Sequence, residues 1–123
     1  MLIGELARAA GVTKDTVRHY DEMQLLETGS RQAGSRTYRE YPASNIERIK
    51  MIQSARAMGF TLGQLQGLIG RYDAGKMPQS EAIALLEQHL EMVRGKIRQL
   101  QQTESMILAK LSGYEVSRGE KVS

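Results

Sequence analysis

The sequence predicts a mainly α-helical protein with one small β-hairpin and one long C-terminal helix. Apolar residues recur at helical spacing along most of the chain. A stretch rich in glycine and serine breaks that spacing between Leu25 and Tyr41, and a heptad repeat follows from Ile83 to Leu111. With 123 residues, 41% of them hydrophobic, one Phe and no Trp, the chain can bury one modest aliphatic core.

The composition excludes several classes of function. The chain has no cysteine, so it offers no disulfide, thiolate metal site or cysteine nucleophile. Its two histidines cannot build a zinc centre without several carboxylate partners. No paired carboxylates, nucleophile–base arrangement or glycine-rich phosphate loop can be nominated. We therefore predict that the protein is not an enzyme and that it binds no metal and no cofactor.

Charge and hydropathy indicate a soluble chain with one basic stretch. The longest apolar run, Ala82–Leu86, is far shorter than the ~20 residues that a membrane helix needs. Charged residues near the N-terminus do not fit a signal peptide, and we expect a cytoplasmic protein with no membrane partner. The net charge is only +3, but residues 28–39 hold three arginines and no acid. Such a stretch indicates contact with a polyanion, although a solvated loop has the same composition.

Two short helices joined by a tight turn are predicted at the N-terminus. Apolar residues share one face of Ile3–Ala10, and Gly11 ends this helix. The next helix opens at Thr13, a favourable N-cap, and turns Val17 and Tyr20 inward. Two helices joined in this way form a helix-turn-helix corner, which presents its second helix outward.

A β-hairpin is predicted where the helical spacing breaks. Turn-forming glycines and serines place its tip near Gln32–Ser35. Tyr38 and Tyr41 favour a strand after the tip. Pro42 ends that strand and opens the next helix.

Two further helices and a linker follow. The first extends from about Ala43 to Met58, and Gly59 closes it. The second starts at Thr61–Gln64, which has the form of a capping box, and its apolar stripe continues to Ile69. Residues 71–78, which contain a glycine and a proline, form a linker or corner.

The clearest element is a helix over residues 80–111, with Ser80 as its N-cap. Its apolar residues follow heptad spacing with one gap at Glu104. At about 1.5 Å per residue it is roughly 45 Å long, too long for the small remainder of the chain to cover. A helical hairpin within one chain would need a second long heptad segment, and the sequence has none. We therefore predict self-association, and we expect the polar tail, residues 112–123, to be disordered. The predicted dimerisation residues are Ile83, Leu86, Leu90, Val93, Ile97, Leu100, Ile107 and Leu111.

Four motifs stand in a fixed order along the chain. They are Ile3-Gly4-Glu5-Leu6-Ala7, Gly11-Val12-Thr13 followed by Val17-Arg18-His19-Tyr20-Asp21, Tyr38-Arg39-Glu40-Tyr41, and Ala55-Arg56-Ala57-Met58-Gly59-Phe60-Thr61-Leu62. Together they resemble the MerR family of bacterial transcription regulators over residues 2 to about 72, and the long helix resembles the family's dimerisation helix. The resemblance implies a winged helix-turn-helix DNA-binding domain over residues 1–72, a linker over 73–79, and a dimerisation helix over 80–111 in an antiparallel coiled coil.

The resemblance also implies a function. Members of the family bind double-stranded DNA as homodimers on a pseudo-palindromic promoter site, distort its spacer and thereby act on RNA polymerase. The alternatives are an effector-independent repressor or architectural DNA-binding protein, and an adaptor that uses its long helix on another coiled coil.

The resemblance assigns DNA contacts to three parts of the chain. The second helix would enter the major groove, the hairpin would form a wing along the phosphates, and the end of the third helix would hold the flanking backbone. Asp15 also suits the first turn of a helix for electrostatic reasons, and Tyr20 fits the core equally well. The candidate DNA-binding residues are Thr13, Lys14, Asp15, Arg18, His19, Tyr20, Arg31, Arg36, Tyr38, Arg39 and Arg56.

Two departures from the family pattern concern the wing and the signal. Thr37 stands where the family usually has glycine, and the wing is about two residues longer. Sensor members carry cysteines near the end of the dimerisation helix or append a drug-binding domain, and we expect neither here. Thiol-based sensing of metals or oxidants is therefore not expected. The protein is either constitutive or controlled by a partner or small ligand at the corner formed by residues 71–78.

Overall fold

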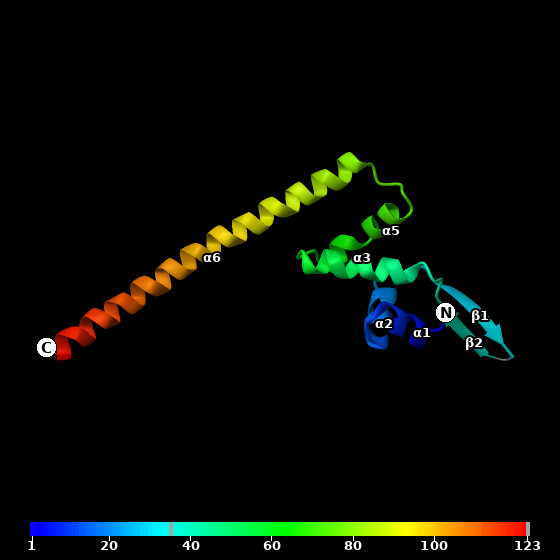
Figure 1. Cartoon of the computed structure of the whole chain (residues 1–123), viewed down its shortest axis with the longest axis horizontal. Helices are drawn as coiled ribbons and strands as arrows, with labels where there is room; N and C mark the ends of the chain where they lie inside the picture. Colours follow the sequence, from blue (N-terminus) through cyan, green and yellow to red (C-terminus); the bar gives the residue numbers. More distant parts are fainter. Residues whose placement is uncertain (35, 123) are drawn as a thin grey trace. The chain divides into compact units, whose positions relative to one another are not determined.

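The structure, a computed structural model, describes residues 1–34 and 36–122, with side chains for all of these except 30–33, 36 and 117–122. The chain divides into two compact units, and the boundary along the sequence lies between Pro78 and Gln79. The first unit contains α1 (Ile3–Ala10), α2 (Lys14–Glu22), β1 (Gly29–Ala33), β2 (Arg36–Glu40), α3 (Asn45–Ala57), α4 (Leu62–Leu65) and α5 (Leu68–Asp73). The second unit is one helix, α6 (Gln79–Val122), and Figure 1 labels all of these elements except α4. The predicted fold class is confirmed: mainly helical, with a small hairpin and a long C-terminal helix.

The helix-turn-helix corner forms as predicted. Gly11 ends α1 in the left-handed conformation, with φ of 71°. The hydroxyl oxygen of Thr13 accepts a hydrogen bond from the backbone N–H of Thr16 at 3.1 Å and so caps α2. Because α1 packs against both α2 and α3, one face of α2 is held in the core and its other face is left to solvent.

The core of the first unit is mostly aliphatic and also contains the rings of Tyr20, Tyr41 and Phe60. Helices α4 and α5 pack against α3 and extend the core beyond the corner. The buried hydrophobic residues are Leu6, Ala7, Val17, Tyr20, Leu25, Leu26, Tyr41, Ile49, Ile52, Phe60, Leu65 and Ile69.

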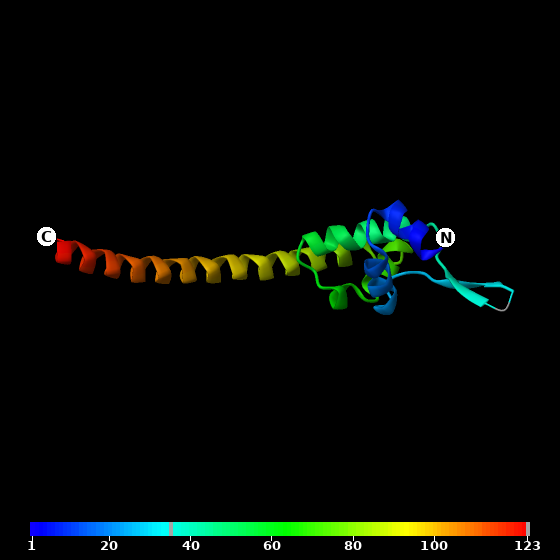
Figure 2. The ribbon, with the colours of Figure 1, turned by 90° about the horizontal axis from the view of Figure 1, so that it is seen from below.

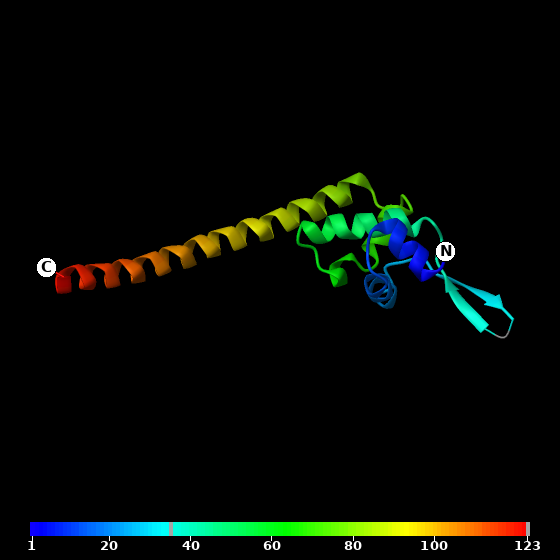
Figure 3. The ribbon, with the colours of Figure 1, turned by 60° about the horizontal axis from the view of Figure 1, so that its bottom comes forward.

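The hairpin projects away from the helices of its unit (Figures 2 and 3). Its strands are antiparallel, and Gly34 adopts a φ of 64° in the connection between them. The base is anchored by Tyr41, which follows β2 and is only 2% exposed. The backbone N–H of Tyr41 donates to the carbonyl of Met1 at 2.7 Å, and the amino group of Met1 donates to the carbonyl of Tyr41 at 2.8 Å. These two hydrogen bonds hold the end of the hairpin against the N-terminus and so fix the base of the wing.

The single helix predicted from Thr61 is two short helices. The capping box is confirmed, because Thr61 and Gln64 each accept the other's backbone N–H, at 3.1 and 2.8 Å. The helix then ends, and Gly67 starts α5 from a left-handed conformation with φ of 75°. Apolar spacing alone did not reveal this break, which depends on the conformational freedom of glycine.

Helix α6 differs from its predicted limits at both ends. It begins at Gln79, so Ser80 lies inside it, and it continues past Leu111 to Val122, which means that the expected disordered tail is helical as far as it is described. The apolar spacing continues to Tyr114, and the ammonium of Lys110 lies 5.8 Å from the centre of that ring. Within the described part of the chain, no helix combines the length and the apolar character that membrane crossing requires.

The side chain of Asn45 ties α3 to the segment before the wing. Asn45 is fully buried. Its amide donates to the carbonyl of Glu27 at 2.6 Å, and its carbonyl oxygen accepts from the N–H of Glu27 at 3.0 Å. Two backbone groups that no strand or helix would satisfy are thereby paired.

Replacing this amide with an apolar group of similar size should destabilise the first unit. In Asn45→Leu, the backbone groups of Glu27 lose both partners, which should lower the free energy of unfolding by about 1–3 kcal/mol. Gln53→Leu, an exposed change on the same helix, should stay within about 0.5 kcal/mol of wild type. Urea unfolding followed by circular dichroism measures both. Equal stability of the two variants would contradict this role of Asn45.

Candidate nucleic-acid interface

The solvent-facing side of α2 carries four of the predicted contact residues. Lys14, Asp15, Arg18 and His19 are all exposed. The aliphatic chain of Lys14 passes close to α1, because a Cβ added to Gly4 would lie 3.2 Å from Lys14 Cε. Glycine at position 4 therefore leaves room for the lysine.

Arg18 has an acidic neighbour on its own helix. Its Nη1 lies 2.7 Å from Asp15 Oδ1. Both side chains are largely exposed, by 55% for Arg18 and 93% for Asp15. Such a surface pair contributes about 0–1 kcal/mol, so a phosphate or a base edge can replace the carboxylate. Asp15 also lies in the first turn of α2, where an acid is electrostatically favourable.

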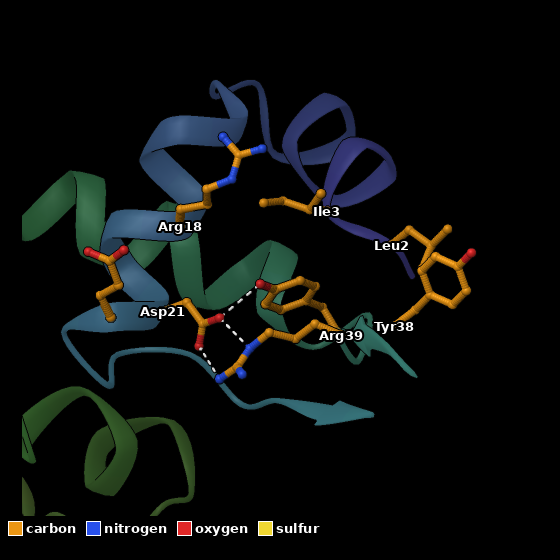
Figure 4. A pocket seen from close by; sticks show the side chains of 8 residues that line it. Leu2, Ile3, Arg18, Asp21, Tyr38 and Arg39 are labelled. Carbon is orange, nitrogen blue, oxygen red and sulfur yellow. Dashed lines mark hydrogen bonds and ion pairs between the residues drawn. The ribbon is translucent and has the colours of Figure 1, made fainter. Parts of the chain in front are cut away.

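The wing is joined to α2 by three residues, Asp21, Arg39 and Tyr41, which we call the Asp21 cluster (Figure 4). Arg39 Nη2 donates to Asp21 Oδ1 at 3.0 Å, and Arg39 Nε pairs with Asp21 Oδ2. The hydroxyl of Tyr41 donates to Asp21 Oδ2 at 2.8 Å. The Asp21 side chain is only 11% exposed, whereas that of Arg39 is 59% exposed. The cluster thus fixes Arg39 at the surface by means of a nearly buried carboxylate.

The Asp21 cluster shifts the pKa of two of its members. Burial, followed by the hydrogen bond to Asp21 and the charge of that carboxylate, raises the pKa of the Tyr41 hydroxyl. The hydrogen bond to Asp21 and its charge raise the pKa of the Arg39 guanidinium. Both shifts favour the protonation states that the hydrogen bonds require.

An open groove of about 480 Å³ lies between α2, the wing and the start of α1. Arg18 borders it from α2 and Arg39 from β2, while the ring of Tyr38 points away from the Asp21 cluster (Figure 4). The groove residues are Leu2, Ile3, Arg18, Asp21, Glu22, Tyr38, Arg39 and Tyr41.

The remaining predicted residues lie in different settings. Tyr20 is a core residue, 7% exposed, which agrees with the core placement given for it; a contact of its hydroxyl with the DNA backbone is compatible with that placement and stays a prediction. Arg56 is exposed and donates to the carbonyl of Phe60 at 3.0 Å, across the turn after α3. Arg31 and Arg36 lie in β1 and β2; their side chains are outside the described residues.

Sequence reasoning missed the residues that organise this interface. Asp21 and Tyr41 belong to the motifs quoted above, but nothing local indicated that they meet. The sequence analysis singled out neither Asn45 nor Arg48, yet both are buried. A polar residue in the inward positions of an amphipathic helix is the signal that could have identified them.

The raised pKa of Tyr41 predicts a loss of stability in alkaline solution. The hydroxyl ionises near 10.0 when the chain is unfolded and at higher pH when it is folded. The stability that Tyr41 contributes is therefore complete below the unfolded pKa and is lost as the pH rises through the folded pKa. Urea unfolding between about pH 9 and 11 should show a steeper decline for the wild-type chain than for Tyr41→Phe. Parallel declines would show that the shift is absent.

Two family models match the chain. The model described as "MerR HTH family regulatory protein" matches residues 1–71, and the model described as "MerR, DNA binding" matches residues 46–110. Together they span the helix-turn-helix corner, the wing and most of α6.

Relatives and solved structures agree with the family models. The chain is 36% identical to the HTH-type transcriptional regulator ZntR of Escherichia coli over 100 residues, which are 80% of this chain and 70% of that protein. It is 35% identical to the mercuric resistance operon regulatory protein of Shigella flexneri over 107 residues, 87% of this chain and 72% of the relative. The crystal structure of the transcription regulator PbrR691 from Ralstonia metallidurans, in complex with lead(II), matches with a TM-score of 0.75 and 30% identity, and covers 88% of this chain and 83% of that one.

The residues of this chain do not fit mercury or lead, the metals named for two of those proteins. The sequence has no cysteine, and soft metals select thiolate ligands. Within the described residues, no three His, Asp or Glu side chains come together in a way that could hold a metal ion.

The first family model covers more than half of the chain, and the ZntR match covers 80% of it at 36% identity. A helix-turn-helix corner with an adjacent wing is the form in which many such proteins meet DNA. The chain is a DNA-binding transcription regulator, not an enzyme, and it belongs to the MerR family.

Proposed function

We propose that the protein acts as a homodimer on a pseudo-palindromic promoter site in double-stranded DNA. One observation carries the proposal: α2 and the wing present Arg18 and Arg39 on the same open groove. In this proposal, α2 enters the major groove and the wing follows the adjacent phosphate backbone. Such a regulator works in the cytoplasm, where the promoter and RNA polymerase are.

The exposed side of α2 supports direct reading of bases. Lys14 and Arg18 lie one helical turn apart and have the hydrogen-bond donors that recognise guanine in the major groove. Arg18 can leave Asp15 at little cost, because their ion pair is exposed. These two side chains therefore carry the sequence preference.

The wing supports a contact of another kind. Asp21 uses only part of the Arg39 guanidinium, and the side chain remains 59% exposed. The remaining N–H groups are available to a phosphate, and a phosphate contact sets position and affinity without reading sequence. Arg39 therefore anchors the backbone at a fixed distance from α2.

The apolar seam of α6 supports the dimer. Seven of its eight predicted seam residues are between 46% and 68% exposed, and Tyr114 continues the same spacing. A row of large apolar side chains of this length is typical of a helix that pairs with another helix. The antiparallel orientation follows the family resemblance. Two linked lobes would then bind both half-sites and distort the spacer between them, through which the dimer acts on RNA polymerase.

If α2 reads bases, removing a positive charge from α2 should change the sequence preference, whereas removing one from α3 should not. Lys14→Ala and Arg18→Ala should each weaken binding to the preferred site by about 1–3 kcal/mol and relax the preference at one position of each half-site. Lys50→Ala removes the same charge from an exposed position on α3 and should leave the preference unchanged. Fluorescence anisotropy on a site selected from random DNA measures all three. Unchanged affinity in both α2 variants would exclude α2 as the recognition helix.

Arg39→Ala should instead weaken binding to all sequences alike and lower the salt slope by about one. It also leaves Asp21 without its cation, so the double variant Arg39→Ala with Asp21→Asn should bind better than Arg39→Ala alone. A change of base preference in Arg39→Ala would mean that the wing reads sequence.

A charge in the seam should separate the protomers. Ile97→Glu places a carboxylate in the middle of the proposed interface, and sedimentation should then show a monomer whose affinity for the operator is much reduced, because the second half-site contact is no longer intramolecular. Gln102→Glu adds the same charge on the opposite side of α6 and should remain a dimer. A monomeric wild-type chain at micromolar concentration would exclude the dimer.

A further inference from the structure

A buried arginine connects the root of the wing with the end of α5. The side chain of Arg48, on α3, is only 9% exposed. Its Nε donates to Asp73 Oδ2 at 3.1 Å, and its Nη2 lies 3.0 Å from the same oxygen. The same Nη2 donates to Glu27 Oε1 at 3.3 Å. One guanidinium is thus shared by two carboxylates from distant parts of the first unit.

Both the backbone and the side chain of Glu27 are hydrogen-bonded, although the side chain is 51% exposed. Its backbone N–H and carbonyl pair with the side chain of Asn45. Its second carboxylate oxygen accepts a hydrogen bond from Ser44 Oγ at 3.0 Å. Since β1 begins at Gly29, shortly after Glu27, the position of Glu27 sets where the wing leaves the helices.

Asp73 is the other carboxylate that Arg48 contacts, opposite Glu27. It is the last residue of α5, and the short segment 74–78 then leads to α6. Asp73 is therefore the helical residue of the first unit that lies nearest to α6 along the chain.

The burial of Arg48 makes its two ion pairs interdependent. If Arg48 loses Asp73, Glu27 still balances its charge, but the Nε–H group loses its hydrogen-bond partner inside the protein, so the guanidinium has to shift toward Glu27 or toward water. A shift of this kind pulls on Glu27, whose remaining groups are already engaged. The position of the wing root thus depends on the end of α5.

We propose that Arg48 is a positioning residue for DNA binding, which acts on the wing through Glu27 and makes the wing responsive to displacement of Asp73. The proposal rests on the proposed function, because it takes the wing as a DNA contact. It assigns a route by which a ligand or partner protein at residues 73–78 would change affinity for the operator. In this proposal, neither Arg48 nor Asp73 has to contact the DNA.

The experiment compares amide hydrogen exchange in the full-length wild-type chain and in Asp73→Asn, without DNA. The substitution keeps the shape of the side chain and removes its charge. Exchange of the amides that join β1 and β2, and of the Glu27 amide, should accelerate by about fivefold or more, while the amides of α1 and α2 change little. A residue that merely stabilises the fold would accelerate exchange throughout the unit.

Two further variants complete the test. Glu47→Gln removes an exposed carboxylate from α3, one that pairs with Lys50 at 3.5 Å, and should leave wing exchange at the wild-type level. In an Arg48→Lys background, which keeps the charge but cannot bridge both carboxylates with a planar fork, Asp73→Asn should have little additional effect on the wing. An undiminished effect in that background would overturn the role of Arg48.

Operator affinity separates this proposal from the function on which it rests. Asp73→Asn should bind the operator more weakly than wild type, although Asp73 does not border the groove between α2 and the wing. If wild type binds DNA and Asp73→Asn leaves wing exchange unchanged, the coupling is refuted and the function stands. If wild type does not bind DNA while Asp73→Asn still loosens the wing, the coupling stands and the proposed function is refuted.

Discussion

The carboxylate of Asp21 is the point on which the geometry of the interface depends. A two-stranded hairpin has too little core to hold its own place in water, and this hairpin projects from the helices of its unit. Asp21 receives the guanidinium of Arg39 from β2 and the hydroxyl of Tyr41 just after it. Because Asp21 belongs to α2, one side chain fixes the wing directly to the helix beside it. Tyr41 then carries that constraint into the core, where its ring is buried.

The exposure of each acid determines what its cation can do. Arg18 and Arg39 both have a carboxylate partner, but Asp15 is 93% exposed and the Asp21 side chain is 11% exposed. Solvent screens the first pair, so Arg18 can exchange its partner for a ligand. In the second pair the carboxylate is nearly buried and also accepts the Tyr41 hydroxyl, so this pair is less screened and more constrained. Similar ion pairs on one surface therefore yield an adaptable side chain and a fixed one, which suits reading and anchoring, respectively.

Local sequence signals predicted the elements, whereas long-range polar contacts had to come from the structure. The C-terminal end of Ile3–Ala10 was located because Gly11 stops the helix, and the capping box of Thr61 was recognised from four residues. Periodicity, by contrast, ranks polar residues as surface and therefore gave no sign that Asn45 and Arg48 are buried. It also could not decide whether Tyr20 belongs to the core. The break at Gly67 was missed because a glycine within an apolar stripe reads equally well as part of a helix.

The disorder predicted for the tail beyond Leu111 rested on composition alone and was wrong as far as the tail is described. Glycines and serines after that residue suggested disorder, yet α6 continues to Val122. A helix of 44 residues gains little from its own hydrogen bonds, since most helical stability in proteins comes from packing of an apolar face. The apolar face of α6 remains exposed along its length, and Tyr114 extends it past the predicted end. A helix of this length that exposes its largest apolar side chains has the character of half an interface, and this is the basis on which we propose a second copy of the same seam as its partner.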